Sequence, residues 1–101
     1  MATTNKPTKL DEDKIEDRML RLRGWSREDG AISRTLQFRD FKESMAFVDK
    51  VAELAERKQH HPGIHIEYQK VRLDLSTHSA GGLTDKDFDI AEEIDRLAAD
   101  R

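Results

Sequence analysis

Apolar and polar residues alternate in three short stretches of the chain, and Trp25 to Glu28 could form a fourth short strand, which makes two pairs. An apolar period of two indicates strands that are buried on one face. Asp29-Gly30, a dipeptide typical of tight hairpin turns, separates the first pair. The sequence therefore predicts two β-hairpins. Strands are expected at residues 25–28, 32–38, 64–68 and 71–76, and the turns that join them in pairs at residues 29–30 and 69–70.

The longest helical pattern lies between the two hairpins. Asp40 is placed to cap a helix over residues 41–59, and Pro62 disfavours helix in the residue before it, so we expect the helix to end near His60 or His61. Its apolar residues recur at steps of three and four, which predicts one face against the core. The main stripe is Phe41, Met45, Val48, Ala52 and Ala55, widened by Phe47, Val51 and Leu54.

Two shorter helical patterns flank this arrangement. The first is expected from about Asp11 to Arg21, after a capping-box pattern that Thr8 begins. The last follows Thr84, for which Asp87 is the partner in a second capping box. Both patterns carry apolar residues at helical spacing, so each helix should pack one face against the sheet.

The predicted order is therefore α-β-β-α-β-β-α. We expect an α+β fold: a four-stranded antiparallel sheet with three helices packed on one face. A chain of 101 residues suits one domain, predicted over residues 9–101 after a flexible tail at residues 1–8. Such a small core favours self-association through the open face or the edge of the sheet.

Composition narrows the classes of function. The chain has no cysteine, which excludes disulfides, thiol catalysis and cysteine-based zinc sites. A net charge of -3 without basic runs makes direct nucleic-acid binding unexpected. No apolar run is long enough for a membrane span, and Met1 to Thr8 lacks the apolar core of a signal peptide. We therefore expect a cytoplasmic protein with no membrane partner.

Three of the four histidines lie where side chains can project beyond a rigid scaffold. His60 and His61 come at a predicted helix end, and His78 follows the last predicted strand. Imidazole suits proton transfer near neutral pH, because its ordinary pKa is about 6.5. A histidine at a helix C-terminus could therefore act as a general acid toward a poor leaving group such as hydroxide.

Simpler interpretations apply to each of these residues. A surface histidine at a helix end is usually only a favourable cap. Glu56, four residues before His60, could orient that ring or be a solvated carboxylate, and Asp87 is favoured as a capping residue alone. Tyr68 could stack on a flat ligand, but its strand pattern favours the core.

A metal site is the main alternative use for these side chains. The four histidines could supply imidazoles, with Glu56 or Asp87 supplying a carboxylate. His61 and His65 have the closest approach to metal-binding spacing, but Pro62 lies between them and no recognised zinc pattern is present. We therefore expect no metal.

A longer pattern joins these candidates: Glu56-Arg57-Lys58-Gln59-His60-His61-Pro62, Tyr68, Thr77-His78, Gly82-Leu83-Thr84 and Asp87. With this pattern the chain resembles the pterin-4a-carbinolamine dehydratase family, over about three-quarters of its length. The resemblance implies the same α-β-β-α-β-β-α fold in dimers or tetramers. It also implies loss of water from 4a-hydroxytetrahydropterin to give quinonoid dihydropterin, in tetrahydrobiopterin recycling, without a metal or bound cofactor.

The resemblance assigns roles to individual residues. His60 and His78 become candidate general acids, and His61 chiefly holds the substrate. Glu56 and Asp87 support the site, and Pro62 and Tyr68 belong to the same matched pattern.

The chain departs from the family pattern at several positions. Many relatives have Asp where this chain has Gln59 and Trp where it has Ile64.

Two alternatives remain beside the enzyme. One is a non-catalytic dimerisation or coactivator-type module that binds through the exposed face of the 40–59 helix. The other is a pterin-binding protein of molybdopterin metabolism.

Overall fold

The computed structural model describes residues 8–99, and the tail predicted at residues 1–8 lies outside this range apart from Thr8. The element order is the predicted one, an α+β fold with a four-stranded antiparallel sheet. A single-turn helix, η1, is added before the last helix. In chain order the elements are α1 Glu12–Met19, β1 Ser26–Glu28, β2 Ala31–Gln37, α2 Phe41–Lys58, β3 Gly63–Glu67, β4 Lys70–Leu75, η1 His78–Ala80 and α3 Asp85–Ala99.

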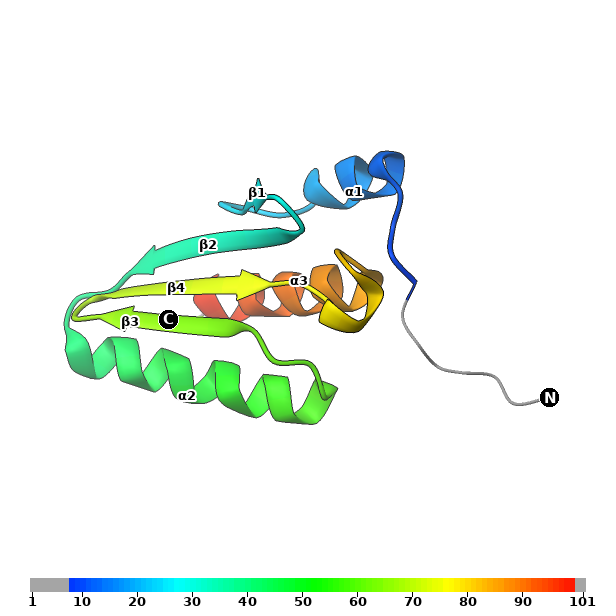
Figure 1. Ribbon diagram of the computed structural model, residues 1–101. Coiled ribbons are helices and arrows are strands. Elements are labelled where there is room, and N and C mark those ends of the chain that lie inside the picture. The colour runs from blue at the N-terminus through cyan, green and yellow to red at the C-terminus, as the bar shows by residue number, and fades with distance from the viewer. Residues whose placement is uncertain (1–7, 100–101) are drawn as a thin grey trace.

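The sheet has the order β1-β2-β4-β3, and every neighbouring pair is antiparallel. Ile32 lies opposite Leu75, and Leu36 opposite Val71, so their side chains share one face of the sheet. Helices α2 and α3 cover this face (Figure 1). Arg27 shares the face with Ile32 and binds Glu12 of α1, so all three helices lie on the same side.

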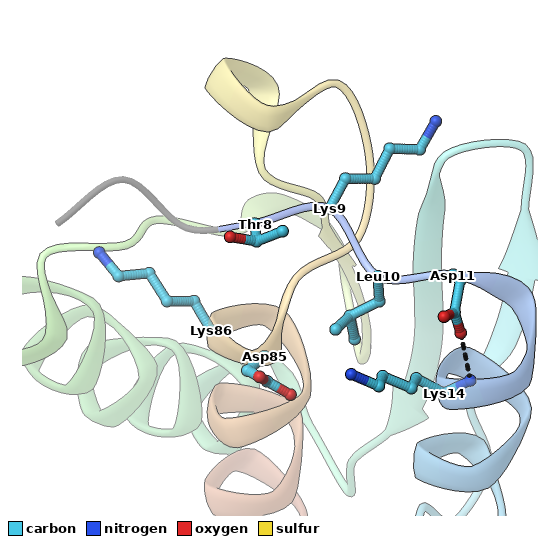
Figure 2. A pocket seen from close by; sticks show the side chains of 7 residues that line it. All are labelled: Thr8, Lys9, Leu10, Asp11, Lys14, Asp85 and Lys86. Carbon is cyan, nitrogen blue, oxygen red and sulfur yellow. Dashed lines mark hydrogen bonds between the residues drawn. The ribbon is translucent and has the colours of Figure 1, made fainter. Parts of the chain in front are cut away.

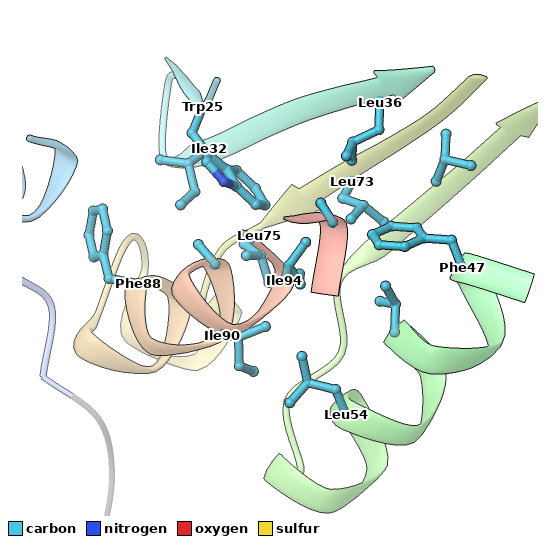
Figure 3. Close-up of a cluster of buried hydrophobic side chains, with 14 of the residues drawn as sticks. Trp25, Ile32, Leu36, Phe47, Leu54, Leu73, Leu75, Phe88, Ile90 and Ile94 are labelled. Carbon is cyan, nitrogen blue, oxygen red and sulfur yellow. The ribbon is translucent and has the colours of Figure 1, made fainter. Parts of the chain in front are cut away.

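The core lies between this face and the helices (Figure 3). It is built from aliphatic residues of β2 and β4 and from one face each of α2 and α3, with Trp25 and Phe88 at the side nearest α1. Each fully buried aliphatic or aromatic side chain contributes about 1.5–3 kcal/mol relative to an exposed one. The largest fully buried side chains include Phe88, Ile32, Leu73, Leu75, Leu83, Ile90, Ile94, Val51 and Val71.

Helix α2 is rotated relative to the expected stripe. Phe47, Val51 and Leu54 are buried, whereas Phe41 is 50% and Met45 36% exposed. The predicted main stripe was therefore wrong about which edge of a wide apolar face meets the sheet. The physical reason is that one sheet covers only part of that face.

Two local predictions also differ from the structure. The cap of α1 is Asp11, whose side chain accepts a hydrogen bond from the Lys14 amide, and not Thr8. The turn between β3 and β4 is Tyr68-Gln69, one residue earlier than expected, because Glu67 pairs with Lys70. Tyr68 takes a left-handed backbone conformation there and is 65% exposed, so its expected place in the core was wrong.

Arginines on α1 and β2 fasten the last helix to the rest of the fold. Arg18 binds Asp85, Asp89 and Glu92 of α3, and its guanidinium lies over the Phe88 ring. Asp85, Asp89 and Glu92 follow one another at steps of four and three residues, so they share one side of α3 and hold α1 against its N-terminal half. On β2, Arg34 pairs with Asp95, which also accepts the Trp25 indole N–H. This explains why Arg34 is tolerated on the core face of its strand.

Candidate active site

The backbone at the end of α2 determines where the two adjacent histidines point. The helix ends at Lys58, earlier than expected, because Gln59 adopts the left-handed conformation with φ of 53°. The His60 amide then donates back to the Ala55 carbonyl, at 3.1 Å. This is a Schellman-type helix end, which turns the chain sharply. His60 and His61 therefore lie outside the helix, in the segment that leads through Pro62 into β3.

A buried carboxylate holds the His60 ring. The His60 Nε2 lies 2.6 Å from Asp87 Oδ1. The Asp87 side chain is 0% exposed and that of His60 12%. The sequence suggested Glu56 as the partner of His60. The structure assigns this contact to Asp87 instead, because His60 has left the helix on which the two residues would share a face.

The other oxygen of Asp87 is occupied by the loop before α3. Asp87 Oδ2 accepts the Thr84 amide at 3.0 Å and the Thr77 hydroxyl at 2.8 Å. Because the Thr77 hydroxyl donates to Asp87, the Thr84 hydroxyl is the donor in the 2.8 Å bond between the two threonines. Asp87 is therefore the helix-capping residue expected from the sequence and also the anchor of His60.

These contacts fix how the His60 ring can handle a proton. The carboxylate has its other oxygen filled by donors, so Nε2 is the ring nitrogen that donates to Asp87. A carboxylate that orients an imidazole in this way leaves Nδ1 to exchange a proton with a substrate. His60 lines a small hollow of about 110 Å³ together with Lys58, Lys86, Asp89 and Ile90.

His61 lies in a more open environment. Its Nε2 is 2.6 Å from Glu56 Oε2, and both side chains are largely exposed. Glu56 therefore contacts a histidine, as expected. That histidine is His61, whereas the helical spacing had suggested His60. An exposed pair of this kind contributes little to stability, so its role is more naturally to position the ring.

His78 is the first residue of η1 and is exposed. It lines a hollow of about 410 Å³ beside the β1-β2 turn, with Thr77 and Gly82. Because Thr77 binds Asp87 and Asp87 binds His60, the two histidine-bearing segments meet at one carboxylate. That the rings of His60 and His78 contact the same substrate molecule stays a prediction.

The remaining sequence candidates lie apart from this cluster. Tyr68 is at the other end of β3, a strand of five residues that spans about 17 Å. Within one chain, Tyr68 therefore does not join the histidines. His65 projects from the open face of the sheet, 3.4 Å from Asp74. His61 and His65, which came closest to metal-binding spacing, thus have different partners. Within residues 8–99, no group of three or more potential ligands could hold a metal ion.

Sequence reasoning did not select four residues that line or build the site. Thr77 and Thr84 supply the buried hydroxyls around Asp87. Lys58 and Lys86 line the hollow next to His60. Thr77, Thr84 and Lys58 belong to the family pattern but were given no role there, and no sequence signal linked Lys86 to His60.

Comparison with known proteins gives the same fold and family. The family model described as pterin 4 alpha carbinolamine dehydratase matches residues 8–97. A protein of Roseiflexus sp. (strain RS-1), provisionally named a pterin-4-alpha-carbinolamine dehydratase, is 49% identical over 90 residues, which cover 89% of this chain and 97% of the relative. A protein of Sulfolobus acidocaldarius with the same provisional name is 43% identical over 89 residues, covering 88% of this chain and 98% of the relative.

Solved structures extend the likeness. The transcriptional coactivator/pterin dehydratase of Brucella melitensis superposes with a TM-score of 0.87 at 32% identity, covering 90% of this chain and 99% of that one. A pterin dehydratase-like protein that is a RuBisCO assembly factor in the alpha-carboxysome has a TM-score of 0.61 at 23% identity, covering 76% of this chain and 88% of the other, and shares the fold. The extent of the family match and of these relatives shows that the chain belongs to the pterin-4a-carbinolamine dehydratase family.

Proposed function

We propose that the chain removes water from a 4a-hydroxytetrahydropterin, with His60 as the general acid. The observation that carries this proposal is the buried carboxylate of Asp87, which binds the His60 ring and the Thr77 hydroxyl at the same time. A ring held in this way has one nitrogen committed and one free to transfer a proton. The family membership supplies the reaction, and the carboxylate supplies a reason why His60 can perform it.

The proposed step needs no electron donor or acceptor. Protonated His60 gives its Nδ1 proton to the 4a-hydroxyl, and the bond between C4a and oxygen breaks to release water. The lone pair of N5 forms the double bond between C4a and N5, and N5 loses its proton to yield the quinonoid dihydropterin. That proton replaces the one His60 donated. A positioned general acid contributes about 10²–10⁴-fold to such a reaction.

The other site residues take supporting roles in this proposal. His61, whose ring contacts Glu56, would hold the substrate. His78 is the second candidate acid, on the far side of Thr77. The physiological substrate proposed is 4a-hydroxytetrahydrobiopterin, and no metal or bound cofactor is required by the step.

A spectroscopic dehydration assay on freshly generated 4a-hydroxytetrahydropterin tests the assignment. We expect His60→Ala to lower kcat by about 10²–10⁴-fold. His65→Ala is the matched control, because His65 lies on the open face of the sheet and pairs with Asp74. Its turnover should equal that of the unmodified chain. Full turnover by His60→Ala would reject His60 as the acid.

The same proposal includes self-association into a homodimer or homotetramer. Four of the five large exposed hydrophobic residues within residues 8–99 gather where α2 begins, and the fifth, Leu20, lies at the end of α1. The Phe38 amide donates to the Gln69 carbonyl at 2.7 Å, so the start of α2 lies beside the β3-β4 turn. Strand β3 is also an edge of the sheet. The large exposed hydrophobic residues in this region are Phe41, Met45, Ile66 and Tyr68.

A second candidate function is a binding module for a regulatory protein. It is favoured by the name of the Brucella melitensis structure, a transcriptional coactivator/pterin dehydratase, and by the exposed apolar residues of α2. This candidate predicts a stable complex that survives His60→Ala and is lost in Met45→Glu. The enzyme proposal instead predicts that turnover is lost in His60→Ala and kept in Met45→Glu.

A further inference from the structure

The loop between β4 and α3 closes on itself before it reaches the last helix. Thr77 and Gly82 exchange two backbone hydrogen bonds, at 2.9 Å from the Thr77 amide and 3.3 Å from the Gly82 amide. Between them, η1 makes a single turn, which Gly81 ends in the left-handed conformation with φ of 77°. Because the loop is closed in this way, His78 at the start of η1 keeps its place relative to Thr77.

The segment before α1 fastens the end of this loop to the fold. The Leu10 amide donates to the Leu83 carbonyl at 2.9 Å. Lys9 packs on Gly82, since an added Cβ at Gly82 would meet the Lys9 Cε at 3.0 Å. In Figure 2, the chain at Lys9 and Leu10 crosses the loop just before α3 begins. The end of the loop is therefore held from outside, and its beginning is held by a different contact.

The beginning of the loop is attached through the Thr77 hydroxyl. Leu75 and Thr77 lie two residues apart in extended chain, so both side chains point into the fold, and Thr77 is 4% exposed. The hydroxyl donates to Asp87 Oδ2 and accepts from the Thr84 hydroxyl. His78, the next residue, is exposed. One residue thus anchors the loop inside the fold and precedes the histidine that the loop presents outside.

The orientation of the Asp87 carboxylate depends on the donors at Oδ2. The torsion that turns a carboxylate about its Cβ–Cγ bond is soft, without a sharply preferred angle. The Thr84 amide and the Thr77 hydroxyl reach the same oxygen from different segments, and together they fix the plane of the carboxylate. Oδ1 is then directed at His60 Nε2, at 2.6 Å. Without the Thr77 hydroxyl one of these donors is lost, and the carboxylate can turn.

We infer that Thr77 is a positioning residue for the dehydration, because its hydroxyl fixes the His60 ring, through Asp87, relative to the loop that carries His78. The inference rests on the proposed function. Thr77 is buried and its hydroxyl proton is committed to Asp87, so it takes no part in the proton transfer itself. Its effect should therefore appear in the rate of the chemical step and not in the binding of the substrate.

The kinetics of dehydration by Thr77→Val test this role. Valine keeps the branched shape and lacks the hydroxyl. We expect kcat to fall about tenfold at an unchanged KM, within the range for groups that orient a histidine. Thr77→Ser keeps a hydroxyl and should restore most of kcat. Thr35→Val removes an exposed hydroxyl from β2 and is the control with unchanged turnover. An unchanged kcat in Thr77→Val, or a rise in KM alone, would overturn the inference.

A second set of variants separates positioning from general damage to the fold. In His60→Ala the ring that Thr77 positions is absent, so adding Thr77→Val should lower kcat no further. Thr84→Val removes the neighbouring buried hydroxyl while Thr77 can still donate to Asp87, and it should lower kcat less than Thr77→Val does. The same loss from Thr77→Val with and without His60 would show that Thr77 acts elsewhere, against the inference.

A measurement on the free protein keeps the two proposals distinguishable. Proton NMR follows the exchange of the His60 Nε2 proton with water, which the bond to Asp87 slows. We expect faster exchange in Thr77→Val and an unchanged rate in Thr77→Ser. Equal rates in Thr77→Val and the unmodified chain would overturn the positioning role. No dehydration by the unmodified chain would instead overturn the proposed function, and the exchange rates would then decide the action of Thr77 on His60 by themselves.

Discussion

The Asp87 carboxylate joins three segments of the chain through two oxygen atoms. It binds the ring of His60 after α2, the hydroxyl of Thr77 after β4, and the amide of Thr84 before α3. Because Asp87 is fully buried, it supplies acceptor atoms where water does not reach. The residue therefore couples the geometry of the site to the start of a helix.

The substitution Asp87→Asn separates these two roles. The Asn oxygen can still accept from Thr77 and Thr84, whereas its NH₂ group would face His60 Nε2 and donate to it. That reverses the tautomer of the ring, so kcat should fall by about 10–100-fold, the range for groups that orient a histidine. The measurement is dehydration kinetics together with a thermal melt. Asp87→Ala should also lower stability, by about 1–3 kcal/mol for each buried donor left unpaired. A normal kcat in Asp87→Asn would contradict the orienting role.

The sequence suggested candidate residues for this site but not their pairing. His60, His61 and Asp87 were selected from their places at helix ends and from the family resemblance, and their roles stay a prediction. The contact between His60 and Asp87 spans 27 residues of sequence, and it depends on how the chain leaves α2. A helical spacing argument paired Glu56 with His60, since nothing in the periodicity revealed that the helix stops at Lys58.

At the scale of elements, helix α2 is terminated by a residue whose backbone conformation is unfavourable for its type. Gln59 has a φ of 53°, a region that glycine adopts more easily. The cost is partly offset by the Gln59 side chain, whose amide donates to the Glu56 carbonyl at 2.7 Å. This turn directs both histidines away from the helix axis.

Replacing Gln59 with glycine should therefore stabilise the fold. We expect a gain of about 0.5–1 kcal/mol in the free energy of unfolding, because the left-handed conformation has little steric cost for glycine. Denaturant unfolding with equal m-values is the measurement. Gln59→Ala is the matched comparison, since it keeps the Cβ and loses the side-chain hydrogen bond, and it should be destabilised. A glycine variant less stable than the alanine variant would contradict this account of the turn.

The open face of the sheet carries a polar network centred on Asp74 of β4. Burial acts to raise the pKa of the Asp74 carboxyl. The hydrogen bonds from Ser33 and Arg72 and the charge of Arg72 outweigh it, so the pKa lies below its ordinary value of 3.8. Asp74 therefore stabilises the fold when it is ionised. That contribution is complete above the unfolded-state pKa and is lost as the pH falls through the lower folded-state pKa.

We expect Asp74→Asn to flatten the pH dependence of stability in acid. Between about pH 5 and pH 2, the unmodified chain should lose more unfolding free energy than the variant, because its folded state binds fewer protons than its unfolded state. Urea unfolding across this range tests the slope. Asp49→Asn, an exposed carboxylate on α2, is the control and should follow the unmodified chain. Parallel curves for all three proteins would contradict the assignment.

The secondary structure was predicted well because it depends on local patterns. Both hairpins, all three helices and the sheet were expected from apolar periodicity and turn residues. The face of α2 that meets the sheet was not predicted correctly, because the apolar residues of this helix extend over a wider arc than the core can bury. The choice between Val48 and Val51 as the buried position depends on the packing of α2 against α3 and β4, which is non-local.

At the scale of the molecule, the large exposed hydrophobic residues within residues 8–99 lie, with the exception of Leu20 at the end of α1, at the end of the fold away from His60 and His78. Phe41 and Met45 of α2 lie there with the edge strand β3 and its turn. An exposed edge strand with apolar neighbours is a surface that proteins usually cover. No helix among residues 8–99 is long and apolar enough to cross a membrane, and the cellular location stays a prediction.

We expect Ile66→Lys to reduce the mass of the assembly in solution. Ile66 lies on edge strand β3, and a charge there would have to be buried in any interface that extends the sheet. Light scattering after size-exclusion chromatography measures the mass. Thr35→Lys puts the same charge on the open face of the inner strand β2. An unaltered mass in this variant is expected, and it would assign the interface to the edge and not to the open face. A monomer in the unmodified chain would contradict the proposed homo-oligomer.

The double use of the Asp87 carboxylate has an evolutionary consequence. A descendant that no longer needed turnover would be free to lose His60 at once, while pressure to keep α3 and its preceding loop in place would retain Asp87 and both threonines. Among distant homologues, the aspartate is therefore a marker of inherited architecture. The imidazole beside it is the better indicator that chemistry has been kept.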